Sequence, residues 1–165
     1  MSLRPLGHGK HIYNDYALTK DEYEKYLHAF FHQADEVSKK TGLYFHVYDP
    51  IYSRILVQHN VQALKICGLG KYLNVDAEGN VIACLFTDLH VGNIREKSIK
   101  EIWLEVISDQ FFQKIHDPTN LKGACGECRY NSICGGCRAR AFQLTGDWFA
   151  SDPACYYTMS TDSKT

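Results

Sequence analysis

The sequence contains no long apolar run, and this absence excludes two classes of protein. No window reaches the roughly eighteen apolar residues that a membrane-spanning helix needs. The opening residues, MSLRPLGHGKHIYNDYAL, also lack the continuous apolar stretch of a secretory signal. We therefore expect a soluble, cytoplasmic protein with no membrane partner.

The chain also lacks an excess of charge of either sign. Its 18 Lys and Arg residues nearly balance 19 Asp and Glu residues, so the formal net charge is -1. A protein with this balance has no global field that attracts nucleic acid or anionic lipid. We expect no nucleic-acid partner, and any partner must be recognised by a local site.

Cysteine, in contrast, is plentiful, with seven residues in a chain of 165. Disulfides rarely persist in a reducing compartment. An odd number of cysteines in a chain of this length also does not suggest a disulfide scaffold. Metal ligation is therefore the leading explanation for these thiols.

Two stretches carry complete helix signals. In each, a Thr or Ser that can cap the helix is followed three residues later by Glu, which forms a capping box, and an apolar stripe follows. The patterns predict a helix from Thr19 that ends at Gly42, and a second helix over residues 98–117 that Pro118 terminates.

Two other stretches predict strands. Residues 43–49, LYFHVYD, are aromatic and short, as in a buried strand, and a proline follows them. Residues 71–84 alternate in polarity and contain the turn sequence Ala-Glu-Gly-Asn, which predicts a β-hairpin. Cys84 lies at the exit of this hairpin, and Cys67 lies just before its entry.

Four cysteines stand close together in CGECRYNSICGGC, residues 125–137. A C-x2-C turn points two sulfur atoms the same way, and its backbone N–H groups can donate to sulfur. Glycines in and just before this segment permit the unusual backbone angles that such a loop needs. The pattern is a strong signal for a metal site and a weaker one for the identity of the metal.

Three interpretations are open on these residues alone. One structural zinc could be held by all four thiolates, but paired zinc knuckles usually stand roughly 15 to 20 residues apart. Here only five residues separate Cys128 from Cys134. This close spacing favours an iron-sulfur cluster, and unligated thiols are the third alternative.

The order of all seven cysteines resembles a known family. The arrangement is Cys67, then Gly79-x4-Cys84, then C-x2-C-x5-C-x2-C from Cys125, then Cys155. It resembles the seven-cysteine SPASM extension at the C-terminus of many radical S-adenosylmethionine (SAM) enzymes. The resemblance covers residues 67–157 and includes the hairpin and the segment GNIREKSIKEIW.

Other segments extend the resemblance. Residues 1–60 are similar to the last βα elements of the catalytic barrel of these enzymes, with Gly7-His8-Gly9 where Gly-Arg-Gly is common. The segments CGGCRARA and GDWFASDPAC resemble the subgroup that modifies haem precursors. Two spacings depart from the usual pattern: x2 replaces x3 before the sixth cysteine, and the interval from Cys67 to Cys84 is one residue longer.

The resemblance implies an α+β fold with three parts. Residues 1–62 would be the C-terminal remnant of a radical SAM α/β barrel. Residues 63–158 would be a SPASM-like auxiliary iron-sulfur domain, made of a small β-hairpin, a helix and Cys-rich cluster-binding loops. Residues 159–165 would be a polar tail.

The resemblance also implies the ligands of two [4Fe-4S] clusters. The first cluster would be held by Cys125, Cys128, Cys134 and Cys155. The second would be held by Cys67, Cys84 and Cys137, which leaves one iron for water, a non-cysteine side chain or substrate. Zinc is the alternative metal.

The activity implied by the resemblance is that of a part rather than a whole enzyme. The auxiliary clusters would relay electrons or bind substrate during oxidative modification of a tetrapyrrole, as in haem biosynthesis. A peptide-modifying maturase and a zinc-stabilised interaction module are the alternatives. The implied partners are a radical SAM barrel in cis, a tetrapyrrole or peptide substrate, and an electron-transfer partner.

One motif of the family is missing from the sequence. Radical SAM chemistry needs a Cys-x3-Cys-x2-Cys loop, whose three thiolates leave one iron free for the amino and carboxylate groups of S-adenosylmethionine. The sequence contains no such loop. We therefore expect no catalysis by this chain alone, no catalytic residues in it, and S-adenosylmethionine only in a full-length enzyme.

Three arginines flank the proposed clusters: Arg129, Arg138 and Arg140. A guanidinium near a cluster would raise its reduction potential or hold a substrate carboxylate, whereas an ordinary solvated arginine would do neither. Tyr156 and Tyr157 follow Cys155 directly and could shield a cluster, although closing the core is the simpler role.

Overall fold

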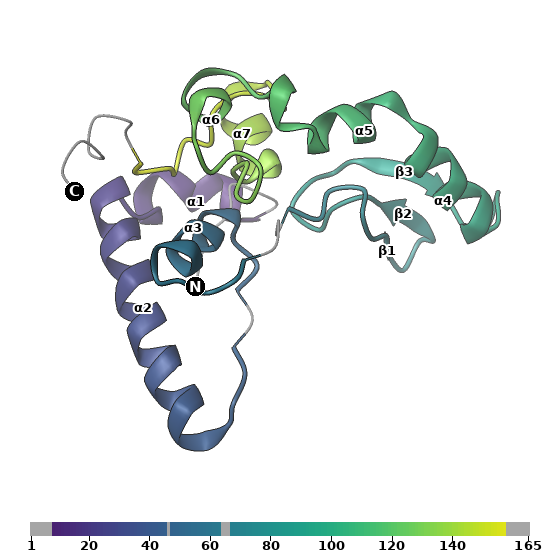
Figure 1. Cartoon of the computed structure of the whole chain (residues 1–165). Helices are drawn as coiled ribbons and strands as arrows, with labels where there is room; N and C mark the ends of the chain where they lie inside the picture. The colour runs from purple at the N-terminus through teal and green to yellow at the C-terminus, as the bar shows by residue number, and fades with distance from the viewer. Residues whose placement is uncertain (1–7, 46, 64–66, 158–165) are drawn as a thin grey trace.

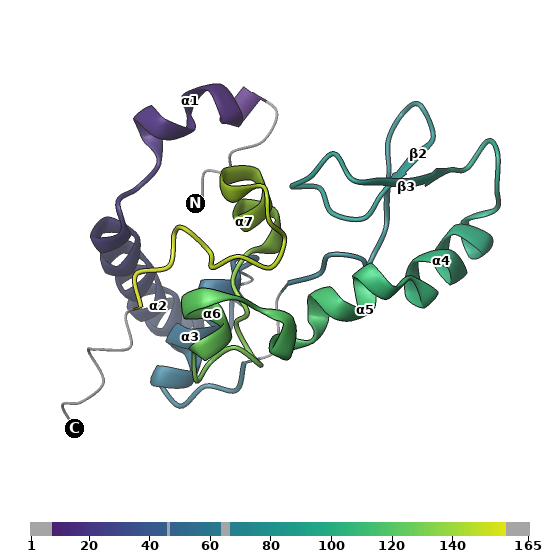
Figure 2. The same cartoon turned by 90° about the horizontal axis from the view of Figure 1, so that it is seen from above.

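The structure is a computed structural model that describes residues 8–45, 47–63 and 67–157 (Figures 1 and 2). The predicted polar tail, residues 159–165, and Gly7 of the Gly7-His8-Gly9 segment lie outside the described residues. In the part of the chain that is described, no helix is long and apolar enough to cross a membrane.

Three helices form the N-terminal part of the molecule: α1 (His8–Tyr16), α2 (Lys20–Thr41) and α3 (Pro50–Gln58). The predicted capping box at the start of α2 is confirmed, since Glu22 N–H donates to Thr19 Oγ1 and Thr19 N–H donates to Glu22 Oε2. Gly42 ends α2 in the left-handed conformation, with φ of +74°. Phe31 of α2 packs against Tyr52 and Ile55 of α3.

The predicted strand over residues 43–49 is wrong. The residues described between α2 and α3 belong to no strand, and the side chain of Tyr44 is 81% exposed. A strand needs a neighbour for its backbone hydrogen bonds, and no strand is present among the described residues before β1. Asp49 and Pro50 begin α3 instead, because the Asp49 side chain accepts from Ile51 N–H and proline suits the first helical turn.

A small antiparallel sheet follows, in the order β1 (Asn74–Val75), β2 (Asn80–Ile82) and β3 (His90–Asn93). The predicted hairpin is β1 and β2, in which Val75 pairs with Val81. Asp76 Oδ1 closes the turn by accepting from Asn80 N–H. The sequence did not predict β3, a short strand that contains a glycine.

The second predicted helix is in fact two helices, α4 (Ile99–Ser108) and α5 (Gln110–His116). Asp109 separates them because its backbone is extended, with φ of -72° and ψ of 129°, and its side chain accepts from Phe111 N–H as the cap of α5. Figure 2 shows both helices along one side of the sheet. Val106, Phe112 and Ile115 belong to the core that includes Ala83 of the β2–β3 loop.

The Cys-rich region lies between the N-terminal helices and the sheet (Figure 1). A short 3-10 helix (Pro118–Asn120) leads to α6 (Gly123–Glu127), and a loop then leads to α7 (Arg138–Thr145). Helices, a small antiparallel sheet and Cys-rich loops together confirm the α+β fold class. The cysteines lie in loops, in the short helix α6 and at helix ends, so the strands themselves carry none of them.

Candidate functional site

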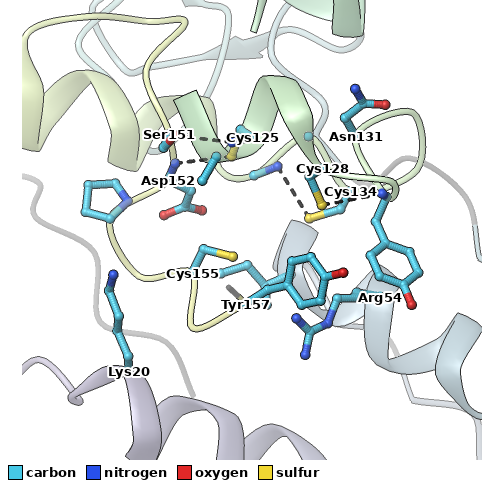
Figure 3. A pocket seen from close by; sticks show the side chains of 16 residues that line it. Lys20, Arg54, Cys125, Cys128, Asn131, Cys134, Ser151, Asp152, Cys155 and Tyr157 are labelled. Atoms are coloured by element: carbon cyan, nitrogen blue, oxygen red, sulfur yellow. Dashed lines mark hydrogen bonds between the residues drawn. The ribbon is translucent and has the colours of Figure 1, made fainter. Parts of the chain in front are cut away.

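Four of the seven cysteines line one pocket, of about 320 Å³. Figure 3 shows Cys125, Cys128 and Cys134 on one side of this pocket and Cys155 on another. The opposite wall comes from the N-terminal helices, through Lys20 and Arg54. We call this space the first pocket.

The other three cysteines line a second pocket, of about 30 Å³. Cys67, Cys84 and Cys137 are all buried there, and Tyr48 and Tyr72 belong to the same lining. The structure thus divides the seven thiols into a group of four and a group of three. All seven are free cysteines, without a disulfide among them.

The same local turn positions the sulfur atoms of three cysteines. In each turn the backbone N–H two residues after the cysteine donates to its sulfur: Phe86 to Cys84, Tyr130 to Cys128, and Gly136 to Cys134. The N-to-sulfur distances are 3.5, 3.4 and 3.4 Å. Such donors favour the thiolate and are a recognised influence on the potential of iron-sulfur clusters.

Two adjacent glycines separate the sulfur atoms of Cys134 and Cys137. Gly135 and Gly136 have φ of +62° and +66°, the left-handed region that side chains disfavour. A Cβ at Gly136 would stand 2.7 Å from Asp152 Cβ and 3.3 Å from Cys125 Sγ. This turn lets Cys134 line the first pocket while Cys137 lines the second.

Burial makes these thiols hard to ionise in the absence of a metal. It raises the pKa of Cys155 to about 11, although a hydrogen bond from Tyr157 N–H partly opposes the effect. Burial likewise raises the pKa of Cys134 and of Cys128, each opposed by the N–H donor of its own turn. Thiolate ligation at this site would therefore release protons.

A buried ion network joins the two groups of cysteines. Arg140 binds Asp152 through two hydrogen bonds of 2.6 and 2.7 Å and binds Asp49 through a third of 3.0 Å. Asp152 in turn accepts from Cys137 N–H at 2.7 Å, and its own N–H donates to Cys125 Sγ at 3.4 Å. Burial disfavours the guanidinium, but the carboxylates of Asp152 and Asp49 outweigh it and hold the pKa of Arg140 well above its ordinary value.

The three arginines singled out in the sequence have different surroundings. Arg140 belongs to the ion network. Arg138 Nη1 donates to two backbone carbonyls, those of Trp148 and Ala150, and its Nη2 lies 3.8 Å from Cys125 Sγ. Arg129 is exposed and donates to the hydroxyl of Tyr130.

A fourth arginine, Arg54 of α3, lines the first pocket and was missed by the sequence reasoning. The only signal for it was a single charge in the otherwise uncharged helix sequence PIYSRILVQ. Arg54 is 4% exposed. Its Cζ lies 4.3 Å from the centre of the Tyr156 ring and 4.6 Å from the centre of the Tyr157 ring. The two tyrosines therefore contact this arginine rather than only closing the core.

Residues 67–138 match the SPASM family, which is described as an iron-sulfur cluster-binding domain. These residues form a SPASM domain. The match begins at Cys67 and includes six of the seven cysteines, and Cys155 lies beyond it.

Relatives in several organisms are similar to a larger part of the chain. An AdoMet-dependent heme synthase of Methanosarcina barkeri is 34% identical over 152 residues, which are 82% of this chain and 42% of the relative. A pre-heme d1 synthase of Dinoroseobacter shibae is 32% identical over 128 residues, or 68% of this chain and 31% of the relative. These similarities confirm the resemblance to the haem-precursor subgroup of radical SAM enzymes.

A PqqA peptide cyclase of Methylocella silvestris is 28% identical over 120 residues, 68% of this chain and 31% of the relative. Among solved structures, the histidine-tagged anSMEcpe with bound AdoMet has the same fold, with a TM-score of 0.53 and 20% identity, and the match covers 85% of this chain and 37% of that one. The chain spans about two-fifths of the length of two of the heme synthases that it matches, those of Methanosarcina barkeri and Oleidesulfovibrio alaskensis.

Proposed function

We propose that this chain is the auxiliary-cluster part of a radical SAM enzyme and that its two pockets hold two [4Fe-4S] clusters. The observation that carries the proposal is the division of seven buried or half-buried thiols into four at one pocket and three at another. A SPASM domain binds iron-sulfur clusters as a family property. The number of clusters and the ligands of each are our proposal for this chain.

The residues at the first pocket fit a [4Fe-4S] cluster. Cys125, Cys128, Cys134 and Cys155 would supply one thiolate to each iron, which is the usual complete ligand set. The backbone N–H groups already directed at Cys128 and Cys134 would offset part of the negative charge of the thiolates. A bound cluster would supply the capacity to accept and release single electrons.

The second pocket offers only three thiolates, from Cys67, Cys84 and Cys137. Three ligands would leave one iron of a cluster open to water, to another side chain or to substrate. Tyr48, Tyr72 and the burial of all three cysteines would limit the access of water. The open iron would be the one position of this second cluster without a thiolate, and a substrate group could bind the cluster there.

The alternative of a single zinc is disfavoured by the geometry. A zinc bound by the quartet in residues 125–137 would need Cys137 beside the other three, but Cys137 lines the second pocket. In the described part of the chain, no three Cys, His, Asp or Glu side chains are arranged to hold one metal ion. A cluster spreads its thiolates over several irons and does not need them to converge on a point.

We propose a tetrapyrrole as the substrate class. The support is the similarity to proteins named heme synthase and pre-heme d1 synthase, since the match to the Methanosarcina barkeri heme synthase extends over 152 residues and that to the Methylocella silvestris PqqA peptide cyclase over 120 residues. A peptide substrate is the second candidate. In either case a radical SAM barrel in cis would generate the substrate radical, and this chain would place and insulate the clusters that take up the electron.

The test is iron and sulfide analysis after anaerobic reconstitution, combined with EPR spectra of the reduced protein. We expect about eight irons in the wild-type chain, as two cubanes require. Cys128→Ala should remove the first cluster and retain the second, and Cys137→Ala should do the reverse. Stoichiometric zinc, with the same metal loss in both variants, would contradict the proposal.

A further inference from the structure

Arg54 is a buried cation whose hydrogen-bond donors are incompletely paired. It lies on α3 among apolar residues, and 5% of its side chain is exposed. Its Nε and Nη1 have no hydrogen-bond partner among the residues that the structure describes. Leaving buried donors of a charged group unpaired is unfavourable, so their presence points to an acceptor that binds there.

The neighbours of Arg54 include one protein acceptor, the buried hydroxyl of Tyr156, which interacts with the side chain but leaves Nε and Nη1 without a hydrogen-bond partner among the described residues. The rings of Tyr156 and Tyr157 lie against its guanidinium, within the range of cation–π interaction. Glu24 Oε1 lies 3.9 Å from Nη2, and the Glu24 side chain is 47% exposed. A half-exposed carboxylate at that distance neutralises the cation only in part.

Arg54 is part of the wall of the first pocket, and its guanidinium lies against the ring of Tyr157, which belongs to the same wall. Arg54 lines that pocket together with its four cysteines, and Figure 3 shows it extending from α3 toward Tyr157, with Cys155 nearby. An acceptor in the pocket would therefore lie within reach of the side chain. Lys20 contributes a second cation to the lining, from the start of α2.

We propose that Arg54 donates hydrogen bonds to the iron-sulfur cluster held in the first pocket and raises the reduction potential of that cluster. This inference rests on the proposed function. It assigns a role to an arginine that comes from the helical part of the chain, outside residues 67–138 that match the SPASM family.

The direction of the effect follows from charge. A [4Fe-4S] core with four thiolates takes up one electron, from an external reductant such as dithionite, and its net charge changes from -2 to -3. A fixed cation stabilises the more negative state more strongly. The buried position of Arg54 keeps this interaction from being screened by water or salt.

The other arginines near the first pocket differ from Arg54 in how their charges and donors are paired. Arg140 binds Asp152 and Asp49, so its charge is compensated within the protein. Arg138 Nη1 donates to backbone carbonyls, and its Nη2 already donates to Cys125 Sγ of the first pocket at 3.8 Å, while its Nε has no partner among the described residues. Arg129 is exposed, although it too lies close enough to Cys128 to influence it, and this makes it a matched control.

The experiment is an EPR-monitored redox titration of the reconstituted full chain. The couple of the first cluster is identified as the one that Cys128→Ala removes. We expect Arg54→Met to lower the equilibrium constant for reduction of this cluster roughly tenfold, which corresponds to about 59 mV for one electron. Arg54→Lys should give a smaller decrease, and Arg129→Met should lower the potential less than Arg54→Met does, because Arg129 is exposed and its charge is screened.

An Arg54→Met protein that carries the first cluster at the wild-type potential would overturn the inference. If Arg54→Met fails to take up this cluster, Arg54→Lys decides: a lowered potential supports the inference, and an unchanged one refutes it. Iron missing from the first site of the wild-type chain would contradict the proposed function itself. That result differs from an unchanged potential, so the two failures can be told apart.

Discussion

Replacing Arg140 with methionine would break the ion network between the two pockets. The side chains of Arg140, Asp152 and Asp49 are 1%, 0% and 4% exposed. Methionine keeps much of the length of the side chain but provides no charge and no donor. The substitution therefore leaves two buried carboxylates without the cation that they share.

The magnitude follows from that burial. Removing one partner of a buried ion pair typically costs ~3–5 kcal/mol, because an uncompensated charge stays inside the protein. The bidentate pairing with Asp152 places the expected loss toward the upper end of this range. For a chain of this size, the loss corresponds to a decrease in Tm of roughly 6–20 °C.

The assay is thermal and urea unfolding followed by circular dichroism under anaerobic conditions, on matched preparations of equal iron content. Asp49→Asn serves as a graded control, since asparagine can still cap α3 and the 3.0 Å bond to Arg140 is weakened rather than lost. It should cost about 1 kcal/mol. Arg140→Met melting within about 1 °C of the wild-type chain would refute the reasoning.

Three further substitutions test local features. Ser98→Ala removes the cap of α4 and should cost about 1 kcal/mol in urea unfolding, whereas an unchanged midpoint would show that the cap is dispensable. The Ser98 hydroxyl and then its N–H lower the pKa of Glu101, so the contribution of this carboxylate is present above its ordinary pKa and is lost as the pH falls through the lowered value. Glu101→Gln should accordingly lose less stability than the wild-type chain on acidification over that range, and equal acid sensitivity would contradict this. Gly136→Ala should reduce the iron content of both sites, because its Cβ would displace Asp152 or Cys125, and full iron retention would contradict the role of this turn.

The features that could be predicted from the sequence are those fixed by neighbouring residues. Thr19 with Glu22 begins α2, and the hairpin forms over residues 71–84, as their patterns predicted. The break at Asp109 was also encoded locally, because aspartate is a strong N-cap, but the continuous apolar stripe outweighed that signal. The prediction of a strand over residues 43–49 was wrong because a strand needs a partner strand, and seven consecutive residues do not show whether one is available.

The candidate site likewise has features that could be predicted from the sequence and features that could not. The C-x2-C spacing and the glycines identify a metal-binding segment, since both act within a few residues. The surroundings of Arg54 could not be predicted, because Tyr156 and Tyr157 meet it from about a hundred residues further along the chain. The burial of a charged side chain depends on such distant contacts, whereas a sequence window indicates only an amphipathic helix.

Asp152 gives the two pockets a shared structural element, and this has a consequence for their independence. Its carboxylate accepts from the backbone of Cys137, and its N–H donates to Cys125, so one residue contacts a proposed ligand of each cluster. Arg140 fixes that carboxylate through both oxygens. A shift of Cys137 on loading or emptying the second pocket would therefore move Asp152, and with it the hydrogen bond to Cys125 at the first. The linkage between Cys137 and Cys125 runs through buried hydrogen bonds of Asp152, which Arg140 holds in place with two further hydrogen bonds. The occupancy of one pocket should therefore change the EPR signal of the cluster in the other.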